Sequence, residues 1–391
     1  MLRSLYSGIS GLRSHQEMLD VTGNNIANVN TVGFKSSSTV FQDTLSQMTQ
    51  GAGGPQTGIG GTNPAQIGLG VQVAGVSTNF AQGSAQATGK ATDLMISGDG
   101  FFVTRLGNDT VYTRAGAFDF DADGRLVSSD GKIVQGYPAV NGVVNANGQL
   151  GDITLPLDAA APAVRTTTAA LTGNLPSDTA VGDTVTRDAT VYDATGAKHT
   201  MSIAYQRTAA GWDVTATNGQ GATATSSITF GADGKVASGG ALTVGGIAVD
   251  MSDLTGFATL NTATISSQNG HEAGSLQGYS ISKDGTVTGT FSNGASLALG
   301  RIALATFANP AGLEKTGASG YRATANSGQA SIGGPGSAGV GSLAAGTLEM
   351  SNVDLSQEFT NLIVAQRGFQ ANARIITTSD EVLQELTNLK R

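Results

Sequence analysis

The chain has 391 residues, including 56 glycines, 8 prolines and no cysteine, and its formal net charge is −8. The lack of cysteine excludes disulfides, thiolate metal sites and a cysteine nucleophile, and 39 % hydrophobic residues at this low charge exclude wholesale disorder. The glycines have no G-X-Y period, which excludes collagen, and the acidic balance argues against a partner made of nucleic acid.

The N-terminal segment is predicted to form a helix with a seven-residue apolar repeat. The row consists of Leu5, Leu12, Leu19 and Ile26. A companion row decays into polar residues at Gln16 and Asn30, so a self-sufficient coiled coil is not expected. Asn24, Asn25 and Asn28 are poor helix formers, and we expect them to form hydrogen bonds at the helix end or to a neighbouring molecule. A plain frayed end of the helix is the alternative.

No targeting or membrane segment is expected in this chain. The N-terminal segment lacks the apolar run of a secretory signal peptide, and no stretch approaches eighteen consecutive apolar residues. The default expectation is a protein that is not embedded in a membrane, with export without a cleaved signal left open.

Residues 51–75 hold nine glycines and two prolines and are predicted to be an extended or flexible connection. A similar glycine-rich stretch covers residues 333–346. The two stretches are predicted to form a hinge between the terminal helices and the rest of the chain, with plain surface loops as the alternative.

Between the two ends the sequence is typical of antiparallel β structure. Turn dipeptides such as Asp123-Gly124, Asp233-Gly234 and Asn293-Gly294 alternate with β-branched runs. Their spacing of roughly 8 to 12 residues favours sandwiches or barrels over βαβ units.

One acidic stretch resembles a calcium-binding loop and is a weak candidate for a metal site. Its carboxylates are Asp119, Asp121, Asp123 and Asp130. The spacing places oxygen ligands at loop positions 1, 3, 5 and 12. The flanking residues are predicted to be strands, so an acidic hairpin turn is the favoured interpretation. No cofactor site and no convergent acid, base or nucleophile is found, so an enzyme is not expected.

The C-terminal segment is predicted to be a second heptad helix that begins after Asp354, a residue suited to cap it, with Gln357 completing a capping box. Its apolar positions are Leu355, Phe359, Leu362, Phe369, Ile376 and Leu383. The two terminal helices are expected to pair with each other or with other copies of the chain, and to order on association. An amphipathic helix packed on a globular domain is the alternative for each.

Three stretches resemble a known protein family. LDVTGNNIANVNTVGFK (19–35), ATDLMISGDGFFV (91–103) and the segment 348–386, which begins LEMSNVDL, are similar to the axial proteins of bacterial flagella, which build the rod, the hook and the hook–filament junction. The large insert at about 149–271 favours the hook branch of the family, because its rod members are shorter.

The resemblance implies a mainly β fold with α-helical termini and discontinuous, nested domains. A terminal coiled-coil polymerisation domain would comprise residues 1–32 and 352–391. Glycine-rich connectors would comprise residues 33–70 and 333–351. An inner β domain would comprise 71–148 and 272–332, and an outer β domain 149–271.

The resemblance also implies a subunit that assembles into a curved, bendable tube and transmits torque from rod to filament. The implied partners are other copies of the chain, the distal rod protein, the hook cap protein, the hook–filament junction protein and the flagellar export apparatus. The implied location is the extracellular hook. A distal rod protein with an insert, or a secreted β-rich adhesin, is the alternative.

Overall fold

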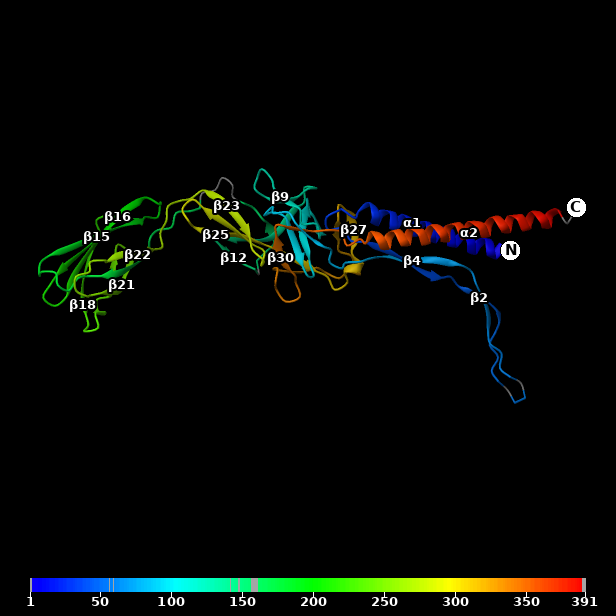
Figure 1. The fold of residues 1–391 in the computed structure, drawn as a ribbon, viewed down its shortest axis with the longest axis horizontal. Helices are drawn as coiled ribbons and strands as arrows, with labels where there is room; N and C mark the ends of the chain where they lie inside the picture. The colour runs from blue at the N-terminus through cyan, green and yellow to red at the C-terminus, as the bar shows by residue number, and fades with distance from the viewer. Residues whose placement is uncertain are drawn as a thin grey trace. The chain divides into compact units, whose positions relative to one another are not determined.

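The computed structural model describes residues 2–55, 57–58, 60–140, 142–146, 148–155 and 161–388. The chain forms two compact units: unit 1 contains Met1–Leu155, Ser280–Thr288 and Ala298–Arg391, and unit 2 contains Pro156–Tyr279 and Gly289–Leu297. Both long helices lie at the chain ends, and the segments between them are built of strands (Figure 1). The prediction of a mainly β protein with helical termini is therefore confirmed.

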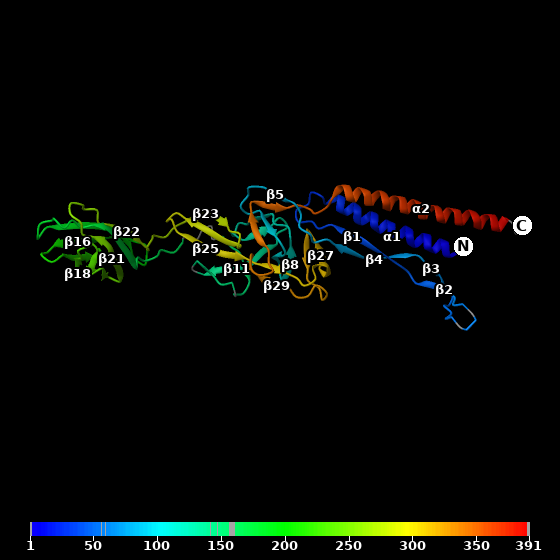
Figure 2. The same ribbon diagram turned by 60° about the horizontal axis from the view of Figure 1, so that its bottom comes forward.

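The two helices belong to unit 1 and run side by side in opposite directions, as both views show (Figures 1 and 2). They are α1 (Leu2–Ala27) and α2 (Leu355–Asn388). Asp354 caps α2 as predicted, because its Oδ1 accepts the backbone N–H groups of Ser356 at 2.8 Å and Gln357 at 3.2 Å. The predicted capping box is incomplete, because the Gln357 amide donates to Asn361 instead.

Two antiparallel strand pairs follow α1, where a flexible connection was predicted. The first pair is β1 (Ser37–Asp43) with β4 (Val71–Thr78), and the second is β2 (Ser46–Gln50) with β3 (Ala65–Gly68). Of the two alternatives predicted for residues 51–75, extended or flexible, these parts are extended and paired, because the β-branched side chains around Val71 and Val73 support a strand even beside so many glycines.

The sheet of unit 1 is antiparallel and carries two hydrophobic clusters. Its main path runs β25 (Ser296–Ile302), β11 (Ile133–Val140), β7 (Phe101–Leu106), β8 (Asp109–Thr113), β28 (Gly320–Arg322) and β27 (Glu314–Gly317). Side branches are β9 (Phe118–Phe120), β10 (Leu126–Ser128), β12 (Val143–Val144), β13 (Gly151–Asp152), β26 (Leu304–Thr306) and β29 (Ser331–Gly333), with a short 3-10 helix at Pro310–Gly312. One cluster packs around Phe102 and Phe118, and the other around Phe101 and Tyr321.

Four short strands join the segment before α2 to the first third of the chain. β5 (Ala85–Ala87) pairs with β31 (Thr347–Glu349), and β6 (Leu94–Ser97) pairs with β30 (Ser342–Ala345). The predicted glycine-rich connector at 333–346 therefore contains a paired strand at its end, so this part of it is not a free loop.

Unit 2 is a sandwich of two sheets with a core of its own. One sheet has the order β20 (Ala241–Val244), β21 (Ile247–Thr255), β14 (Thr168–Asn174) and β22 (Thr264–Gln268). The other has the order β15 (Thr184–Tyr192), β16 (Lys198–Arg207), β17 (Trp212–Thr217), β18 (Thr223–Phe230) and β19 (Val236–Ser238). Trp212, Tyr205 and Met201 are buried between the sheets.

Three strands have residues in both units, namely β23 (Leu276–Ile281), β24 (Thr286–Phe291) and β25. Unit 2 takes in most of the predicted outer domain, 149–271, together with residues on its C-terminal side. The four-part division of the chain stays a prediction.

Candidate polymerisation interface

The seam between α1 and α2 is built from small and polar residues. Gly11 lies against the Asn372 side chain, where a Cβ atom would come within 2.6 Å of Asn372 Oδ1. Gly368 lies against the His15 ring, where a Cβ atom would come within 2.5 Å of the ring. The two backbones approach closely because these positions have no side chain. Apolar side chains complete the seam, since a Cβ atom at Gly8 would lie 3.5 Å from side-chain carbons of Ile375 and Ile376.

The apolar rows predicted for the polymer interface are not fully buried within the chain. Half-buried members are Leu5, Leu12, Leu19, Ile26, Leu362, Ile376 and Leu383. Exposed members are Leu355, Phe359 and Phe369. Each of these side chains therefore retains surface that a neighbouring molecule can cover.

Asn25 connects the end of α1 to the start of α2 inside the chain. Its amide nitrogen donates to the Ser37 carbonyl at 2.7 Å and to Glu358 Oε1 at 2.9 Å, and its Oδ1 accepts the Ser37 N–H at 3.0 Å. The side chain is 1 % exposed, so its hydrogen bonds are all made within the molecule.

Asn24 and Asn28 close the last turn of α1. The Asn28 amide donates to the Asn24 carbonyl at 2.8 Å and to Asn24 Oδ1 at 3.1 Å, and Asn28 Oδ1 accepts the Thr31 hydroxyl at 3.0 Å. These contacts satisfy groups at the helix end, which is one of the two roles expected for these residues. Asn24 is exposed and retains surface for a neighbour.

A buried ion cluster lies where the two chain ends meet the sheet of unit 1. Glu349 Oε1 accepts from Lys35 Nζ at 2.6 Å and from the Gly83 N–H at 2.9 Å, while Glu349 Oε2 lies 3.5 Å from an Arg114 nitrogen. Lys35 and Glu349 are fully buried, and Arg114 is 3 % exposed. Both cations depend on this carboxylate, because burial without a counter-charge is costly.

Burial lowers the pKa of Lys35, and the hydrogen bond and charge of Glu349 oppose that change. Burial likewise lowers the pKa of the Arg114 guanidinium, against the charges of Glu349 and Asp99. The cluster fixes Lys35 and Glu349, which lie in the two predicted connectors, so a free hinge at these two residues is not supported.

Two exposed apolar rows lie on α2, of which the sequence analysis named only Leu355 and Phe359, because it followed only the heptad positions. Leu355, Phe359 and Ile363 succeed each other at a spacing of four and form one row. The second row consists of Val364, Ile375, Val382 and Leu386, which are all exposed. Counting every apolar residue on a helical projection, rather than two heptad positions, is the signal that reveals these rows.

The first strand pairs also expose large apolar side chains. They are Val40, Phe41, Leu45, Met48, Ile67, Leu69 and Val76. Together with the rows on α2, they give unit 1 exposed apolar side chains that other copies of the chain can cover.

The acidic stretch proposed as a weak metal candidate covers the hairpin of β9 and β10 and, at Asp130, the turn from β10 to β11. Its carboxylates pair with cations, Asp119 with Lys90, Asp121 and Asp123 with Arg125, and Asp130 with Lys132. Among the described residues, no cluster of three or more His, Asp or Glu side chains is arranged to hold a metal ion.

Neither α1 nor α2, within its described residues, is long and apolar enough to span a bilayer.

Three family models match this chain. They describe the flagella basal body rod protein at residues 5–35, the D1 domain of the flagellar hook protein FlgE/F/G at 95–168, and the C-terminal part of the flagellar basal body rod FlgEFG protein at 344–389. Two of these matches contain α1 or α2.

Full-length relatives include both hook and rod proteins. The chain is 39 % identical to the flagellar hook protein FlgE of Borreliella burgdorferi, with 100 % of each chain covered. It is 38 % identical to the flagellar basal-body rod protein FlgG of Bacillus subtilis, again with 100 % of each covered. The crystal structure of the Helicobacter pylori flagellar hook protein FlgE2 shares the fold with a TM-score of 0.51 at 14 % identity, covering 68 % of this chain and all of the other.

Proposed function

This chain belongs to the family of flagellar hook and rod proteins, and from that membership we propose that it is the structural subunit of the flagellar hook. Copies of the chain polymerise into a curved tube that bends while it transmits torque from the rod to the filament. The location of the protein is accordingly the hook of the flagellum.

The observation that carries this proposal is the unpartnered apolar surface of the terminal helices. Phe359, Ile363 and Val364 are each more than half exposed on α2, although the helix already has α1 as a partner. Large apolar side chains at such positions are covered when other copies of the chain pack around the helix pair. Contacts between different faces of identical subunits that do not close into a ring generate helical tubes.

The hook is favoured over the rod by the full-length relatives. Hook proteins FlgE of Borreliella burgdorferi and Treponema pallidum are 39 % and 37 % identical over the whole of each chain. The inserted sandwich of unit 2 does not separate the two branches, because the rod protein FlgG of Bacillus subtilis is also matched over its full length.

The finer assignments rest on family membership. We propose that the tube meets the distal rod protein at one end. The hook cap protein and then the hook–filament junction protein contact the other end. The subunits leave the cell through the flagellar export apparatus without a cleaved signal. A homopolymer tube open at both ends needs different partners at its two ends.

The function is tested by deleting the gene in the source bacterium and imaging purified basal bodies by electron microscopy. We expect complete rods without hooks, non-motile cells, and restoration of both by the native gene. Truncated rods would assign the chain to the distal rod instead. Complete hooks in the deletion strain would exclude both functions.

A further inference from the structure

All sulfur atoms of this chain belong to methionine, and one methionine differs from the others in its exposure. The chain has seven methionines and no cysteine. Met48, in the middle of β2, is 60 % exposed. An exposed thioether is open to oxidation to the sulfoxide, which turns a flexible apolar side chain into a polar one.

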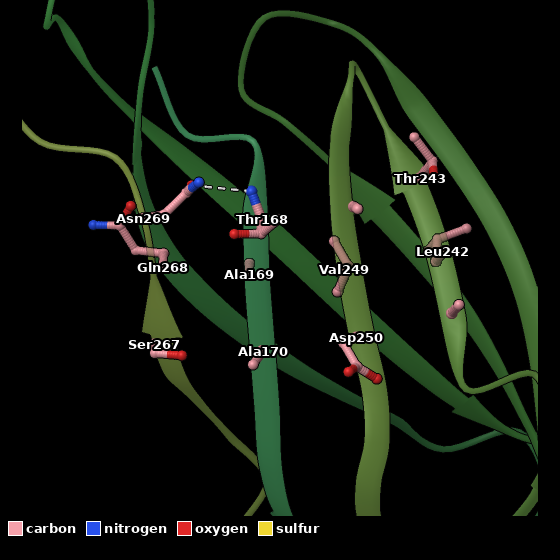
Figure 3. A pocket seen from close by; sticks show the side chains of 12 residues that line it. Thr168, Ala169, Ala170, Leu242, Thr243, Val249, Asp250, Ser267, Gln268 and Asn269 are labelled. Atoms are coloured by element: carbon pink, nitrogen blue, oxygen red, sulfur yellow. Dashed lines mark hydrogen bonds between the residues drawn. The ribbon is translucent and has the colours of Figure 1, made fainter. Parts of the chain in front are cut away.

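The other described methionines are all buried or half-buried. They are Met18, Met95, Met201, Met251 and Met350. Met251 follows Asp250 in β21, and Asp250 lies among the residues that line a hollow on the exposed face of the four-stranded sheet (Figure 3). Successive strand residues point to opposite faces, so Met251 points into the core of unit 2. A small oxidant should therefore react first at Met48.

The sulfur of Met48 stays open to solvent because of its position on the strand. The ladder between β2 and β3 is irregular between Met48 and Gln50, and the Thr49 hydroxyl donates to the Ala65 carbonyl at 2.9 Å across this bulge. The nearby Gly51 has no side chain to cover the sulfur, although a Cβ atom there would lie 4.0 Å from it.

The strand pair that carries Met48 has no hydrophobic core of its own. β2 and β3 form a two-stranded sheet in which every residue is exposed, and none of them belongs to a hydrophobic cluster of the described residues. A two-stranded ribbon of this kind is only marginally stable in water. In the tube, other copies of the chain supply the missing packing, which covers Met48 on β2 and Ile67 on β3.

We propose that Met48 is a site of oxidative modification in the free subunit, and that its sulfoxide keeps the subunit out of the tube. The oxidant is a hydroperoxide. One peroxide oxygen becomes bonded to the sulfur, the O–O bond breaks, and the other oxygen leaves as water or an alcohol, so the sulfur loses the two electrons that the peroxide gains. Burial of the polar sulfoxide in an apolar contact is unfavourable. The inference rests on the proposed function and adds to it a chemical control of assembly.

Peptide mass analysis after graded treatment with hydrogen peroxide tests the site. In the free subunit we expect the sulfoxide to form about tenfold faster at Met48 than at Met18 or Met350, because oxidation follows exposure. In assembled tubes the rate at Met48 should fall about fivefold for the same reason. Equal rates at the three methionines, or an equal rate at Met48 in subunits and tubes, would overturn the proposal.

The effect on assembly is tested with Met48→Leu and with Met350→Leu, the matched control that retains Met48. Each protein and the native chain are treated with peroxide and then polymerised in concentrated sulfate, which strengthens apolar association. We expect about tenfold fewer tubes from the native chain and from Met350→Leu, and an unchanged yield from Met48→Leu, since leucine keeps the volume without the sulfur. Met48→Gln, which is polar without any oxidant, should assemble as poorly as the oxidised native chain.

Treatment with methionine sulfoxide reductases should restore assembly of the oxidised native chain, and this result decides the matter if Met48→Leu fails to assemble even before oxidation. Oxidised native chain that forms tubes at the untreated yield, or that the reductases do not rescue, would overturn the role of Met48 and leave the proposed function intact. Failure of the untreated native chain to form tubes, scored by electron microscopy, would count against both.

Discussion

Glu349 holds together the segment after α1, the segment before α2 and the sheet of unit 1. It is the shared carboxylate of Lys35 and Arg114, and all three side chains are buried. Replacing one charge of a buried cluster leaves the others desolvated and unpaired, which costs more than the cluster contributes to stability when complete.

Glu349→Gln should therefore lower the free energy of unfolding of unit 1 by about 3 to 5 kcal/mol, measured by chemical denaturation with far-UV circular dichroism. Asp119→Asn is the matched control, because the Asp119–Lys90 pair is exposed to solvent and should matter little. Equal, small effects of the two substitutions would show that the cluster does not stabilise the junction.

Tyr321 gives unit 1 a specific sensitivity to alkaline pH. Burial raises the pKa of its phenol from 10.0 to about 12. Between these values the unfolded chain releases the proton while the folded chain retains it, so stability is intact below about pH 10 and falls as pH rises towards 12.

Tyr321→Phe should remove this contribution, which amounts to about 2 to 3 kcal/mol over that range. The measurement compares the free energy of unfolding at pH 9 and pH 11.5 for the native chain, Tyr321→Phe and Tyr6→Phe, whose side chain is 67 % exposed. A pH dependence that is the same in all three proteins would contradict the assignment.

At the scale of elements, the helix pair has glycines at close-contact positions of its seam and large apolar side chains on its exposed surface. The seam contains Gly11 and Gly368, whereas the exposed rows contain phenylalanine, isoleucine and valine. The stability of the pair should therefore come mainly from contacts in the polymer, as expected for helices that order on association.

Phe359→Ser should abolish tube formation while leaving the unfolding midpoint of the monomer nearly unchanged, because the Phe359 residue is 51 % exposed in the monomer. Gln370→Ser, an exposed polar position on the same helix, is the control and should polymerise normally. The readouts are sedimentation and electron microscopy. Normal tubes from Phe359→Ser would remove this row from the interface.

The elements differ in how far sequence predicts them. The heptad rows around Leu12 and Leu362 predict both helices, because a single period sets helix type and length. The pairing of β1 with β4 was not predicted. β1 contains no glycine yet was included in the predicted glycine-rich connector, and the valines of β4 follow directly on that stretch. The ion pair between Lys35 and Glu349 could not be predicted, because residues 314 positions apart carry no local pattern that links them.

At the scale of the whole molecule, the hydrophobic clusters of the described residues in unit 1 share no residue with the core of unit 2. Trp212 is the sole tryptophan, and it is 1 % exposed in the core of unit 2. Its fluorescence therefore reports on unit 2 alone, whereas far-UV circular dichroism reports on both units.

We expect calorimetry to resolve two unfolding transitions, of which one coincides with the change in Trp212 fluorescence. Glu349→Gln should lower the midpoint of the other transition by about 6 to 20 °C and leave the fluorescence midpoint in place. A single transition that both probes follow together, in the native chain and in the variant, would show that the two units unfold as one.

The pairing of α1 with α2 also sets an order of events during synthesis. The ribosome makes the chain from its N-terminus, so α1 is complete more than 300 residues before its partner helix exists, and Lys35 is made long before Glu349. Until the last segment emerges, the seam of α1 has nothing to pack against and Lys35 has no buried carboxylate. A chain terminated before α2 therefore cannot build the helix pair.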